Sequence, residues 1–186
     1  RIAELGVSDT VLVIGTGTIG SFILQSLRLK GAGFIIATDI DEDKLQLARK
    51  MGAEVTINSR EQNLFDRVRQ VAPQGVDIVF DVVGKAQTAQ AGIQLLKKNG
   101  KYVSVGLFDQ EIPVPIQRIT TWQLKILGSY ISSDEYPACI QFLATKKVDL
   151  SPFLTHVVPL SQGVEWFSRL RKGERGLFKV IFHPEE

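Results

Sequence analysis

Three glycines near the start of the sequence have the spacing of a phosphate-binding turn. Gly15, Gly17 and Gly20 form the pattern G-x-G-x-x-G directly after the apolar run Thr10–Ile14. In such a turn the first glycine permits a tight strand-to-helix bend, the second lets the backbone approach a pyrophosphate, and the third lets the helix pack closely. The N–H groups and the dipole of the following helix then face the phosphates. The pattern alone is weak evidence, so its surroundings decide its meaning.

An acidic residue stands where a dinucleotide-binding turn requires one. Asp39 follows Gly20 by nineteen residues and ends the next apolar run, Phe34–Asp39. A carboxylate at this point accepts hydrogen bonds from the adenosine ribose hydroxyls and repels a 2′-phosphate, which favours NAD over NADP. The alternative is that the glycines only make a turn and Asp39 only caps a helix. The agreement of turn, helix and acid in spacing favours the cofactor site.

Other residues that could carry chemistry are sparse. The two histidines, His156 and His183, lack metal-ligand spacing to each other and to Cys139. A single cysteine excludes an internal disulfide framework, and the apolar pattern around Cys139 predicts a packed thiol. Asp81 ends the apolar run Val76–Asp81, where it has two interpretations: a ligand-facing acid at the sheet edge or a strand-end turn.

Composition narrows the function classes. The chain has 186 residues with 22 basic and 20 acidic side chains, a balance too even to indicate a nucleic-acid partner. No apolar run reaches the ~18 residues of a membrane span, and no signal peptide is visible. We therefore expect a cytoplasmic protein without a membrane partner. Because position 1 is Arg and the single methionine is Met51, we expect a piece of a longer protein or a processed chain.

Alternating strands and helices must position the glycine turn and its acid. Short apolar runs predict strands, which are Thr10–Ile14, Phe34–Asp39, Glu54–Asn58, Val76–Asp81, Lys101–Gly106 and Lys125–Ile131. Helical periodicity between them predicts helices, which are Thr18–Lys30, Asp41–Met51, Glu61–Val71 and Gln87–Lys98. This alternation indicates an α/β fold, a doubly wound parallel sheet with helices on both faces.

The alternation of predicted strands and helices ends after about residue 132. The tail predicts two helices, Ser133–Lys146 and Ser161–Arg171, and one strand, Leu177–Phe182. We therefore expect a cofactor-binding domain over 1–132 and a C-terminal segment over 133–186. Trp122 and Trp166 are predicted to be core side chains.

Several motifs in one order resemble the cofactor-binding half of the medium-chain dehydrogenases, in the zinc-type alcohol, polyol and threonine dehydrogenase branch. They are VLVIGTGTIG (11–20), TDIDEDKLQLARKMGA (38–53), VDIVFDVVG (76–84), NGKYVSVG (99–106), LKILGS (124–129), THVVPL (155–160) and FKVIF (178–182). The resemblance covers essentially the whole chain. It implies a Rossmann fold and, for the full-length enzyme, hydride transfer between a secondary alcohol, or a carbonyl, and NAD.

The resemblance also implies roles for individual residues. It assigns cofactor contacts to Gly15, Gly17, Thr18, Ile19, Gly20, Asp39, Ile40, Lys44, Val83, Val105, Gly106, Leu107, Ser129, Tyr130, Ile131 and Lys179. Within this set Asp39 and Lys44 match ribose contacts, and residues 105–107 and 129–131 match strand ends that border the nicotinamide ring. Lys179 matches a basic residue near the cofactor phosphate.

The family's catalytic zinc ligands and proton relay lie mainly in an N-terminal domain, which would precede Arg1. The resemblance therefore assigns no catalytic residue and no metal ligand to this chain. The C-terminal segment packs on that domain in the family, and cofactor domains pair through the last strand. Without that domain the apolar tail would lie in water, so we expect a homodimer or homotetramer.

Three alternatives remain open at this point. The zinc-free quinone and enoyl reductases are disfavoured, because they usually carry another glycine loop and basic residues in place of Asp39. A stand-alone NAD-binding module without chemistry is the second alternative. A structural fragment that serves only oligomerisation is the third.

Overall fold

The computed structural model of the protein describes residues 2–108, 110–132 and 134–184. The chain divides into two compact units, Arg1–Asp134 and Glu135–Glu186, and each is described by itself below. Ser133, the first residue of the predicted helix Ser133–Lys146, lies outside the described residues.

Six parallel strands form the sheet of the first unit. They are β1 (Thr10–Ile14), β2 (Phe34–Asp39), β3 (Val55–Asn58), β4 (Val76–Asp81), β5 (Leu96–Ser104) and β6 (Lys125–Gly128). Their spatial order is β3-β2-β1-β4-β5-β6, and every neighbouring pair runs parallel. The order reverses direction between β1 and β4, which is the switch point of a doubly wound sheet. The predicted Rossmann fold is confirmed.

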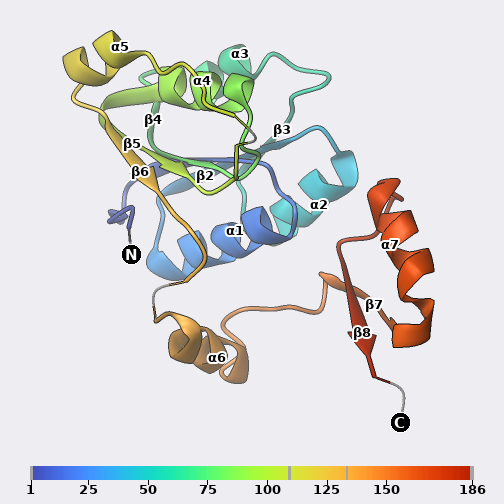
Figure 1. Cartoon of the computed structure of the whole chain (residues 1–186). Coiled ribbons are helices and arrows are strands. Elements are labelled where there is room, and N and C mark those ends of the chain that lie inside the picture. The colour runs from blue at the N-terminus through green and yellow to red at the C-terminus, as the bar shows by residue number, and fades with distance from the viewer. Residues whose placement is uncertain (1, 109, 133, 185–186) are drawn as a thin grey trace. The chain divides into compact units, whose positions relative to one another are not determined.

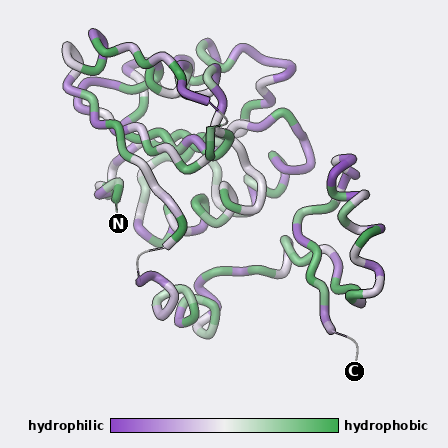
Figure 2. The backbone as a smooth tube through the Cα atoms, viewed as in Figure 1, coloured by the Kyte–Doolittle hydropathy of each residue, from purple (hydrophilic) through white to green (hydrophobic). Residues whose placement is uncertain are grey.

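Helices cover both faces of this sheet, as Figure 1 shows. They are α1 (Thr18–Lys30), α2 (Glu42–Lys50), α3 (Leu64–Val71), α4 (Ala86–Leu95) and α5 (Ile116–Thr121). Alternation along β1 directs Val11 and Val13 into a core with α1 and α2, and Leu12 and Ile14 into a core with α3 and α4. Figure 2 shows the hydrophobic stretches following the strands of this sheet, as burial of both faces requires.

Side-chain caps determine where two of the helices begin. The Asp41 side chain accepts a hydrogen bond from the N–H of Asp43, so α2 starts at Glu42. The Asn63 side chain accepts from the N–H groups of Phe65 and Asp66, so α3 starts three residues later than the predicted Glu61. Asparagine and aspartate are favoured at this position because they satisfy first-turn N–H groups.

The boundary between α4 and β5 differs from the prediction. Leu96 leaves the helix for an extended conformation and pairs with Val76, so α4 ends before the predicted Lys98. The strand then ends at Ser104, because the next two N–H groups both donate to the carbonyl of Asp81 and leave the ladder. Its register with β4 shifts once, between Val76 and Ile78.

The chain around β6 also departs from the prediction. The strand ends at Gly128, short of the predicted Ile131, whose φ of 53° is left-handed and cannot continue a strand. The short helix α5 was not predicted. Its Arg118 donates to the carbonyls of Gln94 and Leu96, and its guanidinium lies 3.8 Å from the ring centre of Trp122. Trp122 packs against the core but is only partly buried.

The second unit holds a small parallel pair of strands with helices beside it. Its elements are α6 (Tyr136–Ala144), β7 (Leu154–Pro159), η1 (Leu160–Gln162), α7 (Gly163–Arg171) and β8 (Lys179–His183). β7 pairs with β8 and was not predicted. Phe153 and Trp166 are buried, which agrees with the core role predicted for Trp166. The predicted burial of Cys139 is wrong, because its thiol lies on the exposed surface of α6.

Candidate functional site

The glycine turn lies at the switch point of the sheet, between the end of β1 and the start of α1. Gly15 has a φ of +90°, a left-handed conformation that favours glycine. Its N–H donates to the carbonyl of Thr38 on β2 at 2.8 Å. A Cβ at Gly15 would lie 2.8 Å from the Cγ2 atom of Val83, which follows β4. The turn is therefore packed between its two neighbouring strands.

Gly17 and Gly20 have different surroundings. A Cβ at Gly20 would lie 2.0 Å from the carbonyl oxygen of Gly15, so the first turn of α1 closes directly on the glycine turn. A Cβ at Gly17 would meet no described atom within 4 Å. Gly17 is the N-cap of α1 and has no side chain that could accept a hydrogen bond from the first turn. This open helix N-terminus can receive an anion.

Asp39, at the end of β2, is held against the glycine turn. Its Oδ2 atom accepts from the N–H of Thr16 at 2.8 Å and from the Thr16 hydroxyl at 3.3 Å. Its Oδ1 atom accepts from the N–H groups of Ile40 at 2.8 Å and Asp41 at 3.1 Å. The carboxylate is half-buried. The spacing noted in the sequence thus brings the acid and the turn into direct contact.

A second acid, Asp81, is fully buried at the end of β4. Its Oδ1 atom accepts from the N–H groups of Val83 at 2.9 Å and Gly84 at 3.1 Å, and its Oδ2 atom accepts from the Tyr102 hydroxyl at 2.8 Å. Burial, together with the charge of Asp81 and the hydrogen bond to it, raises the pKa of Tyr102 far above its ordinary value. Of the two interpretations of Asp81, this geometry agrees with the strand-end turn.

The loops after β4 and β5 fit closely against each other. A Cβ at Gly84 would lie 2.5 Å from the carbonyl oxygen of Leu107, and a Cβ at Gly106 would lie 2.5 Å from the nitrogen of Gly84. The N–H groups of Val105 and Gly106 both donate to the carbonyl of Asp81 at 2.9 Å. These contacts fix both loops relative to the end of β4.

Large apolar side chains are exposed at or just beyond the carboxyl ends of these strands. They are Ile19, Ile40, Val83, Leu107, Tyr130 and Ile131, with exposed fractions from 39% to 82%. Ligands of open parallel sheets bind at this edge, near the switch point. An exposed apolar edge beside an open helix N-terminus suits a ligand that has one anionic part and one planar apolar part.

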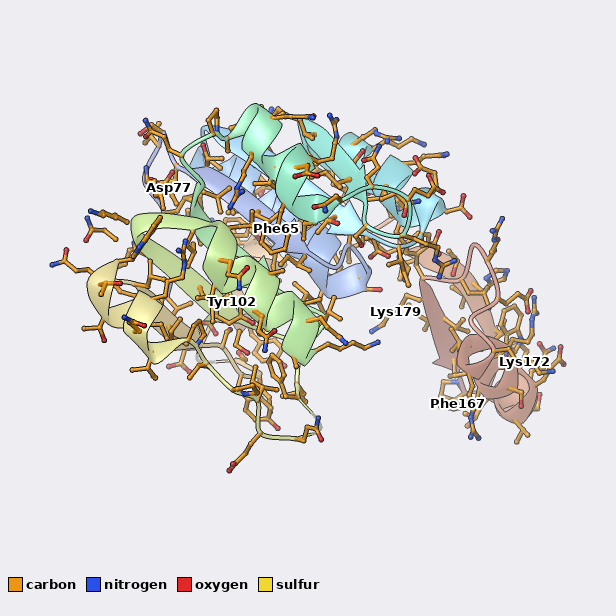
Figure 3. The ribbon with its side chains drawn as sticks, turned by 90° about the horizontal axis from the view of Figure 1, so that it is seen from above. Phe65, Asp77, Tyr102, Phe167, Lys172 and Lys179 are labelled. Carbon is orange, nitrogen blue, oxygen red and sulfur yellow. The ribbon has the colours of Figure 1, made fainter. Side chains whose placement is uncertain are left out.

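The structure brings most of the predicted site residues to this edge. Thr18 begins α1, Lys44 is half-buried on α2, and Ser129 donates its N–H to the carbonyl of Ser104 beyond the end of β6. Lys179 is exposed on β8 in the second unit, and it is labelled in Figure 3.

Two residues of this site were missed by the sequence reasoning. Thr16 is fully buried and donates twice to Asp39, and its position inside the glycine pattern was the available signal. Tyr102 is 3% exposed, and its contact with Asp81 depends on the register of β4 and β5. Nothing local in the sequence signals that register.

Across the described ranges, no three His, Cys, Asp or Glu side chains come together in a way that could hold a metal ion. In the part of the chain that the structure covers, no helix has the length and apolarity needed to cross a membrane.

Comparison with known proteins extends these observations. The family described as zinc-binding dehydrogenase matches residues 18–145. L-idonate 5-dehydrogenase of Vitis vinifera is 30% identical over 190 residues, which cover 98% of this chain and 52% of that protein. Sorbitol dehydrogenase of Bacillus subtilis (strain 168) is 30% identical over 183 residues, covering 97% of this chain and 52% of the relative.

A solved structure agrees with the fold. The alcohol dehydrogenase TADH from Thermus sp. ATN1 superposes with a TM-score of 0.88 at 25% identity, covering 96% of this chain and 51% of that one. The chain thus spans about half the length of the relatives that it matches.

Proposed function

Because the chain belongs to the zinc-binding dehydrogenase family, we propose that it is the NAD-binding half of an alcohol or polyol dehydrogenase. The observation that carries the proposal is the direct contact between the glycine turn and Asp39 at the switch point of the sheet. A tight turn without a ligand does not require an acid held against it. Together these two features provide the parts that a dinucleotide needs.

The glycine turn would hold the pyrophosphate. The open space around Gly17 allows phosphate oxygens to approach the backbone, and the dipole of α1 favours their negative charge. Thr18 and Ile19 lie in the first turn of α1, where their backbone amides would face those oxygens. Lys179 would be the basic residue near the cofactor phosphate.

Asp39 would select NAD over NADP. Four donors hold its carboxylate, and the longest of these contacts, from the Thr16 hydroxyl at 3.3 Å, is the one that a ribose hydroxyl could replace. A 2′-phosphate would instead meet the fixed negative charge at close range. Lys44 and Ile40 would line the same ribose.

The loops after β4, β5 and β6 would receive the nicotinamide end. Val83 and Leu107 present exposed apolar side chains there, and Ser129, Tyr130 and Ile131 follow β6 at the same edge. Val105 and Gly106 would border the carboxamide group. When bound, the nicotinamide ring supplies the hydride-accepting carbon. The role of this chain is to orient that ring and to exclude water from its face.

The remaining chemistry would belong to the other half of the protein. The relatives whose length is about twice that of this chain include enzymes of L-idonate and sorbitol, so we infer a secondary alcohol or polyol substrate. The described residues do not fit a zinc site, and no step is assigned to zinc in this chain. We infer further that the segment 133–186 packs on that half, and that the protein forms a homo-oligomer.

Titration of the chain with NADH tests the proposal. Wild type should bind NADH at one site, and Asp39→Ala should lose roughly 10- to 150-fold in affinity, the equivalent of hydrogen bonds to one charged group. Asp43→Ala is the matched control, because it removes an exposed acid from the first turn of the neighbouring α2. Equal NADH affinity in Asp39→Ala and wild type would refute the assignment of Asp39. Absence of binding in folded wild type would refute the cofactor site.

A further inference from the structure

A buried tyrosine and a buried acid meet beneath the loops that we assign to the nicotinamide end. Tyr102 lies on β5, and its hydroxyl donates to the Oδ2 atom of Asp81 at 2.8 Å. Helix α4 covers the ring, because a Cβ at Gly92 would lie 3.1 Å from the Cε2 atom of Tyr102. Figure 3 shows Tyr102 in this place, beside α4. Burying a carboxylate costs free energy unless the group is hydrogen-bonded, so the Tyr102 hydroxyl stabilises the buried side chain of Asp81.

Asp81 connects two loops through a single residue. Its side chain accepts from the N–H groups of Val83 and Gly84, and its carbonyl accepts from the N–H groups of Val105 and Gly106. These four donors are backbone N–H groups, which no substitution except proline removes. The Tyr102 hydroxyl is therefore the contact on Asp81 that a substitution can test.

The side chain of Val83 lies where the two parts of the proposed site meet. Its Cγ2 atom is 2.8 Å from the position that a Cβ would have at Gly15, so it fills the space above the glycine turn. The same side chain is 39% exposed toward solvent at the sheet edge. A small rotation of the loop at Val83 would therefore change both the packing on Gly15 and the apolar surface offered to a ligand.

We propose that Tyr102 and Asp81 form a positioning pair, which fixes Val83 and the loop after β5 for the nicotinamide ring of the cofactor. The inference rests on the proposed function and adds residues that contact no ligand themselves. The hydroxyl orients the Asp81 carboxylate, the carboxylate orients the N–H groups of Val83 and Gly84, and the loop presents the Val83 side chain. Loss of the hydroxyl leaves a buried charge with fewer partners and frees the loop to shift.

The pair acts on one end of the cofactor, which makes it testable with two ligands. NADH and ADP-ribose share the adenosine and the pyrophosphate, but ADP-ribose lacks the nicotinamide. In the 186-residue chain, Tyr102→Phe should weaken NADH binding about 3- to 10-fold, part of the effect of one charge-assisted hydrogen bond. ADP-ribose affinity should stay within about twofold of wild type, because Asp39 and the glycine turn are unchanged.

Two further variants separate positioning from a merely structural role. Val68→Ala removes a buried side chain on α3 that makes no assigned contact with the site, so it lowers stability without changing either affinity. Val83→Ala removes the side chain that the pair positions. In the Val83→Ala background, Tyr102→Phe should have little further effect on NADH affinity, as residues that act through one another are not additive.

The possible results of these titrations distinguish a failure of the positioning role from a failure of the proposed function. Equal losses for NADH and ADP-ribose, or no loss for either, would overturn the positioning role. Wild type that binds neither ligand would refute the proposed function instead. If Tyr102→Phe does not fold, the comparison is made between Asp81→Asn and Asp81→Asn/Tyr102→Phe, in which the buried group is neutral. The same selective loss of NADH affinity is then expected, and its absence overturns the inference.

Discussion

Replacing Gly17 and Gly20 with alanine, one at a time, should separate cofactor binding from folding. The two glycines lie three residues apart in one motif, yet their surroundings differ completely. A Cβ at Gly20 would lie 2.0 Å from the carbonyl oxygen of Gly15, whereas a Cβ at Gly17 would meet no described atom within 4 Å. We expect Gly20→Ala to damage the fold and Gly17→Ala to damage binding alone.

The loss of stability expected for Gly20→Ala follows from the steric overlap between the new Cβ and the carbonyl oxygen of Gly15. To restore an ordinary contact, α1 or the glycine turn would have to move by at least about 1 Å, and overpacking of this kind costs roughly 1–3 kcal/mol or more. Alanine is the better helix former by about 1 kcal/mol, which offsets part of that cost. Because an approach of 2.0 Å is severe, the cost lies at or above the upper end of that range, and the free energy of unfolding should fall by roughly 2 kcal/mol or more.

Gly17→Ala should change the free energy of unfolding less than Gly20→Ala does, and its main effect should be on NADH affinity. The φ of −63° at Gly17 is open to alanine, and the loss of a good N-cap residue and the gain from a stiffer unfolded chain nearly cancel, within about 1 kcal/mol. The added methyl group would occupy the space assigned to the pyrophosphate. NADH affinity should fall at least about tenfold, or 1.4 kcal/mol.

Urea denaturation, followed by circular dichroism, measures stability, and fluorescence titration with NADH measures binding. The reasoning is refuted if Gly20→Ala is as stable as wild type. It is equally refuted if Gly17→Ala binds NADH as tightly as wild type while it stays folded.

Three other predictions follow from the structure and the proposed function. Burial raises the pKa of Tyr102, so above about pH 10 the tyrosine ionises in the unfolded chain but stays neutral in the folded one. The stability that Tyr102 contributes is therefore complete below about pH 10, and above it the free energy of unfolding falls by up to about 1.4 kcal/mol per pH unit. Urea unfolding between about pH 9 and 11 should thus show a steeper loss for wild type than for Tyr102→Phe, and equal slopes would contradict this. The isolated chain should not reduce NAD with simple alcohols, because the proton relay is assigned to the other half of the protein; absorbance of NADH checks this, and turnover would contradict it. Light scattering should show a homo-oligomer, because apolar side chains of the second unit such as Val164 and Phe167 are exposed; a 20.6 kDa monomer would contradict it.

Much of the fold could be predicted because it depends on short-range patterns. Buried parallel strands are near-continuous apolar runs, and five of the six predicted strands of the sheet begin within one residue of their observed starts. The exception is β5, which begins at Leu96 because this residue pairs with Val76. Such a pairing is a tertiary contact that the pattern of either segment does not contain. The pairing of β7 with β8 was missed for the same reason.

The residues of the site also fall into two groups, those that local spacing predicts and those that depend on tertiary contacts. The glycines and Asp39 could be predicted, because a turn, a helix start and a strand-end acid have fixed spacing. The hydrogen bond between Tyr102 and Asp81 could not, because it requires the register of two strands and the cover of α4. The left-handed φ of Ile131 could not be predicted either, since a β-branched residue disfavours that conformation.

Calorimetric titration of the wild-type chain with NADH and with NADPH tests the central claim most directly. The account predicts one NADH site and an affinity for NADPH at least about tenfold weaker, because the 2′-phosphate meets the carboxylate that the glycine turn holds in place. Equal affinities, or tighter binding of NADPH, by the folded chain would contradict it.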